Sequence, residues 1–184
     1  MATDEYNELL VERVRSFVNT YELHEDEDRL RTPADLLGWF EEMDLLDETA
    51  PGPPKVTTAD LDLAHQLRAT LRDLLRSKRD GVPTESHAAH EVEELSAELP
   101  LRVVLWSDGQ PYLVPAVAGA RHALARILAA VAAMAPNNWE RLKICAADDC
   151  EWVYYDSSRN HSRRWCSMEG CGNRSKVRTY RTRH

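Results

Sequence analysis

The position of the cysteines is the feature that most constrains what this chain can fold into. All four cysteines lie within the last 40 residues, and the first 144 residues contain none. A disulfide framework in a secreted domain would distribute its cysteines so that they staple the whole chain. Cysteines that cluster in one short segment instead indicate a metal site. The four residues are Cys145, Cys150, Cys166 and Cys171.

The cysteines form two pairs with a regular spacing. Four residues separate the partners within each pair, and fifteen residues separate the pairs. This pattern is typical of the two knuckles of a structural zinc site, in which four thiolates surround one ion and the bound metal contributes folding free energy. We therefore predict one structural Zn²⁺. A four-thiolate iron–sulfur cluster and disulfides in oxidised material remain alternatives at this point.

The charged residues are distributed as unevenly as the cysteines. The chain has 23 lysines and arginines against 31 acids, for a net charge of -8. Residues 141–184 carry ten basic and five acidic side chains, a net charge of +5, which leaves -13 on residues 1–140. Such an asymmetry indicates a nucleic-acid-binding module on a different scaffold. The alternative is that the two halves neutralise each other by docking.

The part of the chain without cysteine is predominantly helical by its pattern. Apolar side chains recur at helical spacing in five segments, which are residues 5–21, 33–45, 58–78, 85–98 and 116–135. Thr32 precedes Pro33 as a favourable N-cap, Gly81 is a plausible C-terminal stop, and Pro136 ends the last segment. The acidic residues 22–28 predict a solvated loop or a frayed helix end, and the proline-rich residues 47–57 predict a linker or surface loop.

One segment changes to the alternating period of a strand. Residues 101–105 and 111–114 flank Asp108-Gly109, which is a strong signal for a β-hairpin near residues 101–115. The expected fold class is therefore mainly α with a small β-hairpin, that is, α+β. We expect a helical N-terminal domain over residues 1–135 and a four-cysteine zinc finger over residues 136–184.

The zinc finger should have a treble-clef-like order of knuckle, strand and helix. Residues 151–155 are rich in aromatic and β-branched side chains and predict a strand whose partner stays open. Residues 156–160 predict a turn. Ser167 is a favourable N-cap for a final helix, in which Val177 and Tyr180 are expected to face inward.

The basic residues near the C-terminus form two groups that suit phosphate binding. Arg174, Arg178 and Arg181 follow i, i+4, i+7 spacing along one helix face, with Lys176 and Arg183 on an adjacent face. Arg159, Arg163 and Arg164 form a second group. Alternatively, Arg163, Arg164 and Arg174 offset the charge of -2 that four thiolates and one Zn²⁺ carry together. We predict that all eight residues contact DNA.

No arrangement of side chains in residues 1–135 indicates catalysis. There is no glycine-rich phosphate loop, no nucleophile motif and no metalloprotease motif. His87 and His90 have a possible metal spacing, but a polar helix surface explains them better. An enzyme pocket lined by Asn19, His65 or His122 is the least supported alternative. We therefore expect a protein that is not an enzyme.

The sequence contains no sign of membrane insertion or export. No apolar run reaches about 18 residues, and the acidic start lacks the basic and apolar regions of a signal peptide. We expect a cytoplasmic protein with no membrane partner.

Residues 171–174, Cys-Gly-Asn-Arg, resemble the motif of the CGNR zinc-finger family. The likeness includes the pair Cys145 and Cys150 and residues 158–160, 163–168 and 176–178, so it spans about 40 residues of the chain. Residues 17–20, Phe-Val-Asn-Thr, resemble the ABATE domain that commonly precedes this finger in bacterial proteins. The family is described as stress-induced transcription regulators. Asp148 and Asp149 depart from a basic finger, because they make the first knuckle acidic.

This resemblance implies a DNA-binding transcriptional regulator with one structural zinc ion. Its N-terminal domain would form a homodimer or sense a small-molecule effector. The alternative is a protein-interaction or small-molecule sensor protein whose zinc finger is purely structural. The acidic body, which would repel DNA, motivates that second hypothesis.

Overall fold

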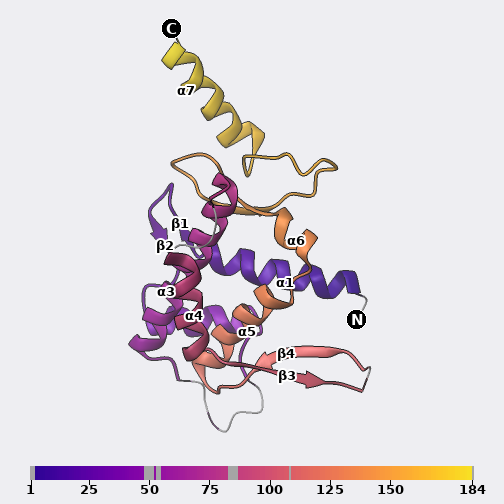
Figure 1. Ribbon diagram of the computed structural model, residues 1–184. Helices are drawn as coiled ribbons and strands as arrows, with labels where there is room; N and C mark the ends of the chain where they lie inside the picture. Colours follow the sequence, from indigo (N-terminus) through magenta and orange to yellow (C-terminus); the bar gives the residue numbers. More distant parts are fainter. Residues whose placement is uncertain (1–2, 48–51, 53–54, 83–86, 108, 184) are drawn as a thin grey trace.

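The computed structural model describes residues 3–47, 52, 55–82, 87–107 and 109–183 (Figure 1). Helices dominate, with short antiparallel strand pairs between them, so the predicted α+β class is confirmed. The elements are α1 (Thr3–Val18), β1 (Tyr21–Glu22), β2 (Glu27–Asp28), α2 (Pro33–Glu42), α3 (Thr58–Asp80), α4 (His87–Glu98), β3 (Leu101–Leu105), β4 (Pro111–Pro115), α5 (Ala120–Ala133), α6 (Pro136–Arg141), β5 (Leu142–Ile144), β6 (Val153–Tyr155), a short π-helix (Met168–Gly172) and α7 (Asn173–Arg183).

The main core lies where α1, α3 and α5 meet. α1 packs against both of the other helices, and Phe17, Leu67, Leu71 and Leu124 are almost completely buried there. These positions follow the apolar spacing of the sequence, because residues three or four apart share one face of a helix. Burial of this face is the main source of stability for the helical part.

The ends of the helices follow the capping signals in the sequence. Thr32 and Thr57 begin α2 and α3 as capping boxes, in which each threonine hydroxyl accepts a hydrogen bond from a backbone N–H three residues later. Gly81 ends α3 in the left-handed conformation, with φ of 66°. Pro136 ends α5 and also begins the short helix α6, because proline is favoured at a first helical position.

The acidic segment over residues 22–28 is more ordered than a loop. It contains β1 and β2, which pair antiparallel with Tyr21 opposite Asp28. The Asp28 carboxylate lies 2.5 Å from the buried guanidinium of Arg68 on α3. Burial tends to raise the pKa of Asp28, but this contact and a backbone hydrogen bond from Leu30 lower it below the ordinary value. A solvated loop therefore describes only the exposed turn at residues 24–26, whereas the residues on either side of the turn pair as strands.

The hairpin of β3 and β4 has the predicted position and pairs Leu101 with Pro115. β4 packs against α5, and the hairpin lies at the end of the molecule opposite α7 (Figure 1). Val103, Leu105 and Trp106 are exposed.

The second hairpin, β5 and β6, joins the cysteine-rich segment to the helical core. Leu142 pairs with Tyr155, so β5 is the partner strand of β6 that the sequence had left open. Leu142, Ile144 and Val153 are buried in the same core cluster as the helices. β5 packs against α3, and β6 packs against α1. The apolar core is thus continuous from the helices into the base of the cysteine-rich segment.

Polar contacts reinforce this junction. The Asn19 side chain forms two hydrogen bonds of 2.8 Å with the backbone N–H and C=O of Val153, as a neighbouring strand would. On α3, the Arg76 Nε donates to Glu151 at 2.8 Å, and the Lys78 Nζ donates to the carbonyl oxygen of Leu142 at 2.6 Å. The motif residue Asn19 therefore has a structural role at the junction.

Among the residues that the structure describes, none of the helices has both the length and the apolar composition that crossing a membrane requires. The side chain of His87 lies outside the description, so the His87–His90 pair is untested.

We expect Asn19→Ala to destabilise the protein by about 2–3 kcal/mol, because it leaves the backbone groups of Val153 without their partner at a buried strand. Urea unfolding followed by circular dichroism measures the effect. Asn137→Ala makes the same change at an exposed position and should shift the free energy of unfolding by less than about 0.5 kcal/mol. Equal stability of the two variants would contradict the assigned role.

Candidate metal centre and nucleic-acid interface

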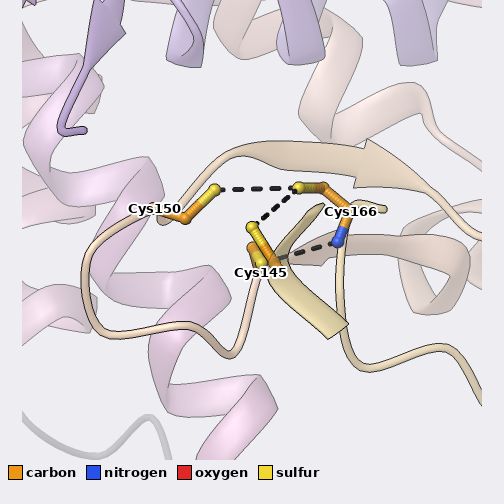
Figure 2. Close-up of side chains that lie close together, drawn as sticks. Cys145, Cys150 and Cys166 are labelled. Carbon is orange, nitrogen blue, oxygen red and sulfur yellow. Dashed lines mark hydrogen bonds between the residues drawn. The ribbon is translucent and has the colours of Figure 1, made fainter. Parts of the chain in front are cut away.

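The four cysteine sulfurs converge on one point. All four Sγ atoms lie within 4.8 Å of one another. The Sγ atom of Cys166 lies 3.7 Å from that of Cys150 and 3.6 Å from that of Cys171, and Figure 2 shows the side chains of Cys145, Cys150 and Cys166 lying close together. A tetrahedron with zinc–sulfur bonds of about 2.3 Å has edges of about 3.8 Å. The thiols are free and not joined as disulfides, so the site fits one structural zinc ion.

Backbone hydrogen bonds hold the ligands in place. The N–H of Cys145 donates to the Trp152 carbonyl at 2.9 Å, and that of Cys150 donates to the Ala147 carbonyl at 3.1 Å. These bonds shape the first knuckle between β5 and β6. Ser167 caps the π-helix by accepting from the N–H of Gly170 at 3.2 Å, which confirms the predicted N-cap. The first knuckle thus lies at the turn of the β5–β6 hairpin, and the terminal helix follows, which is a treble-clef-like arrangement.

Burial and mutual proximity determine how easily the sulfurs lose their protons. Burial raises the pKa of the Cys150 thiol to about 12, and the neighbouring Cys145 sulfur adds to the shift. Burial also raises the pKa of Cys166. Burial acts on Cys145 in the same direction, but backbone hydrogen bonds from Ala147 and Cys166 lower its pKa. Four thiolates are therefore stable together only when a divalent cation compensates their charge, as zinc does.

Each residue of the segment 171–174 has a structural role. Cys171 supplies a sulfur, and a side chain on Gly172 would place its Cβ 2.9 Å from the Sδ of Met168. The Asn173 amide donates to the carbonyl oxygen of Glu169 at 3.2 Å. The Arg174 Nη2 donates to the Cys171 Sγ at 3.2 Å, which offsets the negative charge of the cluster.

The acidic first knuckle holds the terminal helix. Asp149 lies 3.6 Å from the Arg174 guanidinium. Arg178 lies 2.8 Å from Asp148 and 4.0 Å from Asp149. We call these two arginines and two aspartates the knuckle clamp. It turns one face of α7 toward the first knuckle.

The other predicted DNA contacts lie in different environments. Arg163 donates to the Cys166 carbonyl at 2.6 Å and lies 5.0 Å from the ring centroid of Tyr154, and Arg164 lies 5.5 Å from the ring centroid of Trp165. Arg159, Lys176 and Arg181 are exposed. The Arg183 side chain lies outside the description.

The terminal helix differs from expectation in one respect. Val177 and Tyr180 were expected to face inward, but they are 50% and 67% exposed. The reason is that α7 projects from the body, so no other element covers this face within the described part of the chain (Figure 1).

Sequence reasoning missed a buried polar network beneath the loop of residues 156–165. The Asp156 carboxylate is fully buried, and it accepts hydrogen bonds from the Lys143 Nζ at 2.7 Å, the Ser158 hydroxyl at 2.6 Å and the Arg163 N–H at 3.0 Å. Burial opposes the charged form, but these donors hold the Asp156 pKa well below its usual range. An aspartate two residues before a serine in a predicted turn was the available signal.

The matches to known families agree with this geometry. Residues 141–184 match the family described as "CGNR zinc finger". Residues 13–136, more than half of the chain, match the ABATE family, described as "Putative stress-induced transcription regulator". The chain belongs to the ABATE family. This ABATE protein carries its CGNR zinc finger at the C-terminal end, as the sequence motifs predicted. A search of curated proteins finds no match.

We expect reduced preparations of this ABATE protein to contain one equivalent of zinc by elemental analysis. Cys166→Ser should lose most of it, because a structural site needs all four thiolates. Occupancy should also fall as the pH is lowered, since protons compete for the sulfurs. Met168→Leu removes a nearby sulfur that is not a predicted ligand and should keep the zinc. Zinc-free wild-type protein, or full occupancy in Cys166→Ser, would refute the site.

We expect Asp156→Asn to destabilise the zinc-loaded protein by about 3 kcal/mol, because it leaves the ammonium of Lys143 without its buried anionic partner. Urea unfolding with zinc present measures the loss. Ser157→Ala, at the exposed neighbouring position, serves as the control and should have little effect. An unchanged midpoint in Asp156→Asn would mean that the network contributes little.

Proposed function

We propose that this protein is a DNA-binding transcription regulator whose zinc finger makes the DNA contacts. One observation carries the proposal. α7 contains five basic residues and no acidic residue, and it projects away from an acidic body (Figure 1). A cationic helix that stands apart from the negative surface can approach DNA phosphates without bringing the body close to them. The family description as a transcription regulator supports this interpretation.

The zinc ion has a structural role in this proposal. It joins the knuckle between β5 and β6 to the start of α7, so the direction of α7 depends on the four sulfurs. The N-terminal domain is proposed to dimerise or to sense an effector. We infer a non-catalytic protein, because the Asn19 amide is occupied by Val153, while His65 and His122 have backbone partners at Leu30 and Val117.

A specific observation favours a second candidate function, a small-molecule sensor with a purely structural finger. A cavity of about 460 Å³ lies between the C-terminal turn of α3 and the finger, within the size range of ligand sites. Lys78 and Arg79 line it from α3, and Tyr154 and Arg163 line it from the finger. Burial lowers the pKa of Lys78 to about 8. Five cationic and three acidic side chains line the cavity in all, and a lining with excess positive charge suits a small anion.

A DNA titration of the full-length, zinc-loaded protein separates the two candidates. We expect binding to a mixed-sequence duplex to weaken steeply with salt, with a log–log slope of about -3 to -5 for a few phosphate contacts. Binding should disappear when zinc is removed by a chelator, because α7 then loses its anchor. No binding at low salt, or binding that is insensitive to salt, would leave the sensor function as the better account.

A further inference from the structure

The knuckle clamp divides α7 into two faces. Successive residues of an α-helix are rotated by about 100°, so Arg174 and Arg178 share the side that faces Asp148 and Asp149. Lys176 lies on the opposite side of the helix. Val177 and Tyr180 are 50% and 67% exposed and lie on the same side as Lys176, which is also exposed, whereas Arg181 lies along the clamped face. The two clamped arginines thus fix which side of the helix turns outward.

Resting on the proposed function, we propose that this outward face of α7 enters the major groove of DNA. Val177 and Tyr180 contact base edges, Lys176 contacts a flanking phosphate, and the knuckle clamp sets the rotation of the helix. Arg174 and Arg178 are positioning residues in this arrangement and do not themselves determine sequence selectivity.

The dimensions and charge of α7 suit this groove. Eleven residues give a helix about 16 Å long, and the major groove is about 12 Å wide, which admits one α-helix. The helix carries only positive charge, so it complements the phosphates on both sides of the groove. Its projection from the body allows the outward face to reach the groove floor before the acidic N-terminal half meets the backbone (Figure 1).

The outward side chains can make both base-edge contacts and phosphate contacts. The Val177 methyl groups can pack against the methyl group of thymine, and the Tyr180 ring and hydroxyl can contact a base edge. Lys176 presents a point charge on a flexible chain, which suits a phosphate without sequence preference. We therefore assign recognition of the DNA sequence to Val177 and Tyr180, the two residues that the amino-acid pattern had predicted to face inward.

An anionic membrane surface is the competing occupant of a basic helix with exposed apolar side chains. The described outward face offers only Val177 and Tyr180 as large apolar groups. Membrane-surface helices bury a broad apolar face among the acyl chains. The narrow apolar strip and the high density of charge therefore favour the groove of DNA.

The test uses the full-length, zinc-loaded protein and a random duplex library. Duplexes selected by repeated binding and sequencing provide a preferred site, and a scrambled duplex of the same composition provides the reference. The ratio of the two affinities measures selectivity, and the salt dependence of each counts phosphate contacts. Zinc content and circular dichroism verify that each variant is folded.

We expect Val177→Ala and Tyr180→Ala each to lower the selectivity ratio about tenfold, with little change in affinity for the scrambled duplex. Lys176→Ala should weaken binding to both duplexes equally and reduce the salt slope by about 1. Lys55→Ala removes the same charge from an exposed position in the N-terminal half and should change neither quantity.

A double variant tests the positioning role of the knuckle clamp. Asp148→Asn with Asp149→Asn should lower the selectivity ratio while zinc content and affinity for the scrambled duplex are kept or increased, because two charges that repel phosphate are removed. Asp148→Glu with Asp149→Glu should restore the ratio at least in part. A clamp that only stabilised the fold would change the unfolding midpoint and leave the ratio unaltered.

The outcomes separate this inference from the function on which it rests. DNA binding with a selectivity ratio unaffected by Val177→Ala and Tyr180→Ala would overturn the groove assignment and leave the regulator proposal standing. No binding to any duplex would overturn both. Binding of the protein to phosphatidylglycerol vesicles through Tyr180, without binding to duplexes, would assign α7 to a membrane surface instead.

Discussion

The meeting of four sulfur atoms is the contact on which the C-terminal part of this protein depends. Two of the ligands lie at the ends of a knuckle between β5 and β6, and the other two bracket the turn that begins α7. Without a cation, burial holds the thiol pKa values of Cys150 and Cys166 high. Four thiolates therefore form here only when a divalent ion displaces the protons, and the spacing of the sulfurs fits such an ion. The direction of α7 follows from this cluster, because the helix begins directly after Cys171.

The cluster is joined to the helical core by contacts of several kinds. Val153 and Ile144 are buried with the helices, and Asn19 pairs with the backbone of Val153 in the manner of a strand. Glu151, directly after a ligand, has a left-handed backbone with φ of 52°, and its carboxylate pairs with Arg76 on α3. These contacts combine apolar burial with ion pairing, so the base of the finger is packed as a continuation of the core.

The basic residues near the C-terminus fall into two groups. Some contact other groups within the finger, and others are exposed to solvent. Arg174 and Arg178 lie against the first knuckle, and Arg163 lies over Tyr154. Lys143, outside the predicted DNA contacts, holds the buried Asp156 carboxylate. Lys176 and Arg181 remain exposed on α7. Part of the positive charge thus neutralises acids within the finger itself, and part remains available for a polyanionic partner.

The amino-acid sequence by itself determined the zinc ligands, the helices of the N-terminal part and the hairpin of β3 and β4. Each of these rests on local rules: thiolate spacing, apolar period, and capping residues such as Thr32 and Gly81. The same rules failed where one local pattern is compatible with more than one structure. The apolar spacing of Val177 and Tyr180 indicated burial, and the acidic segment before Arg29 indicated a loop.

Only the tertiary structure decided how the parts meet. The pairing of Asn19 with Val153 joins residues 134 positions apart, and the pairing of Arg178 with Asp148 joins residues 30 positions apart. No local period encodes such contacts, because they depend on the direction in which β5, β6 and α7 leave the core and the zinc site. Charge and spacing in the sequence identified the basic helix. The face of that helix that turns toward solvent depends on Asp148 and Asp149, which only the fold brings beside it.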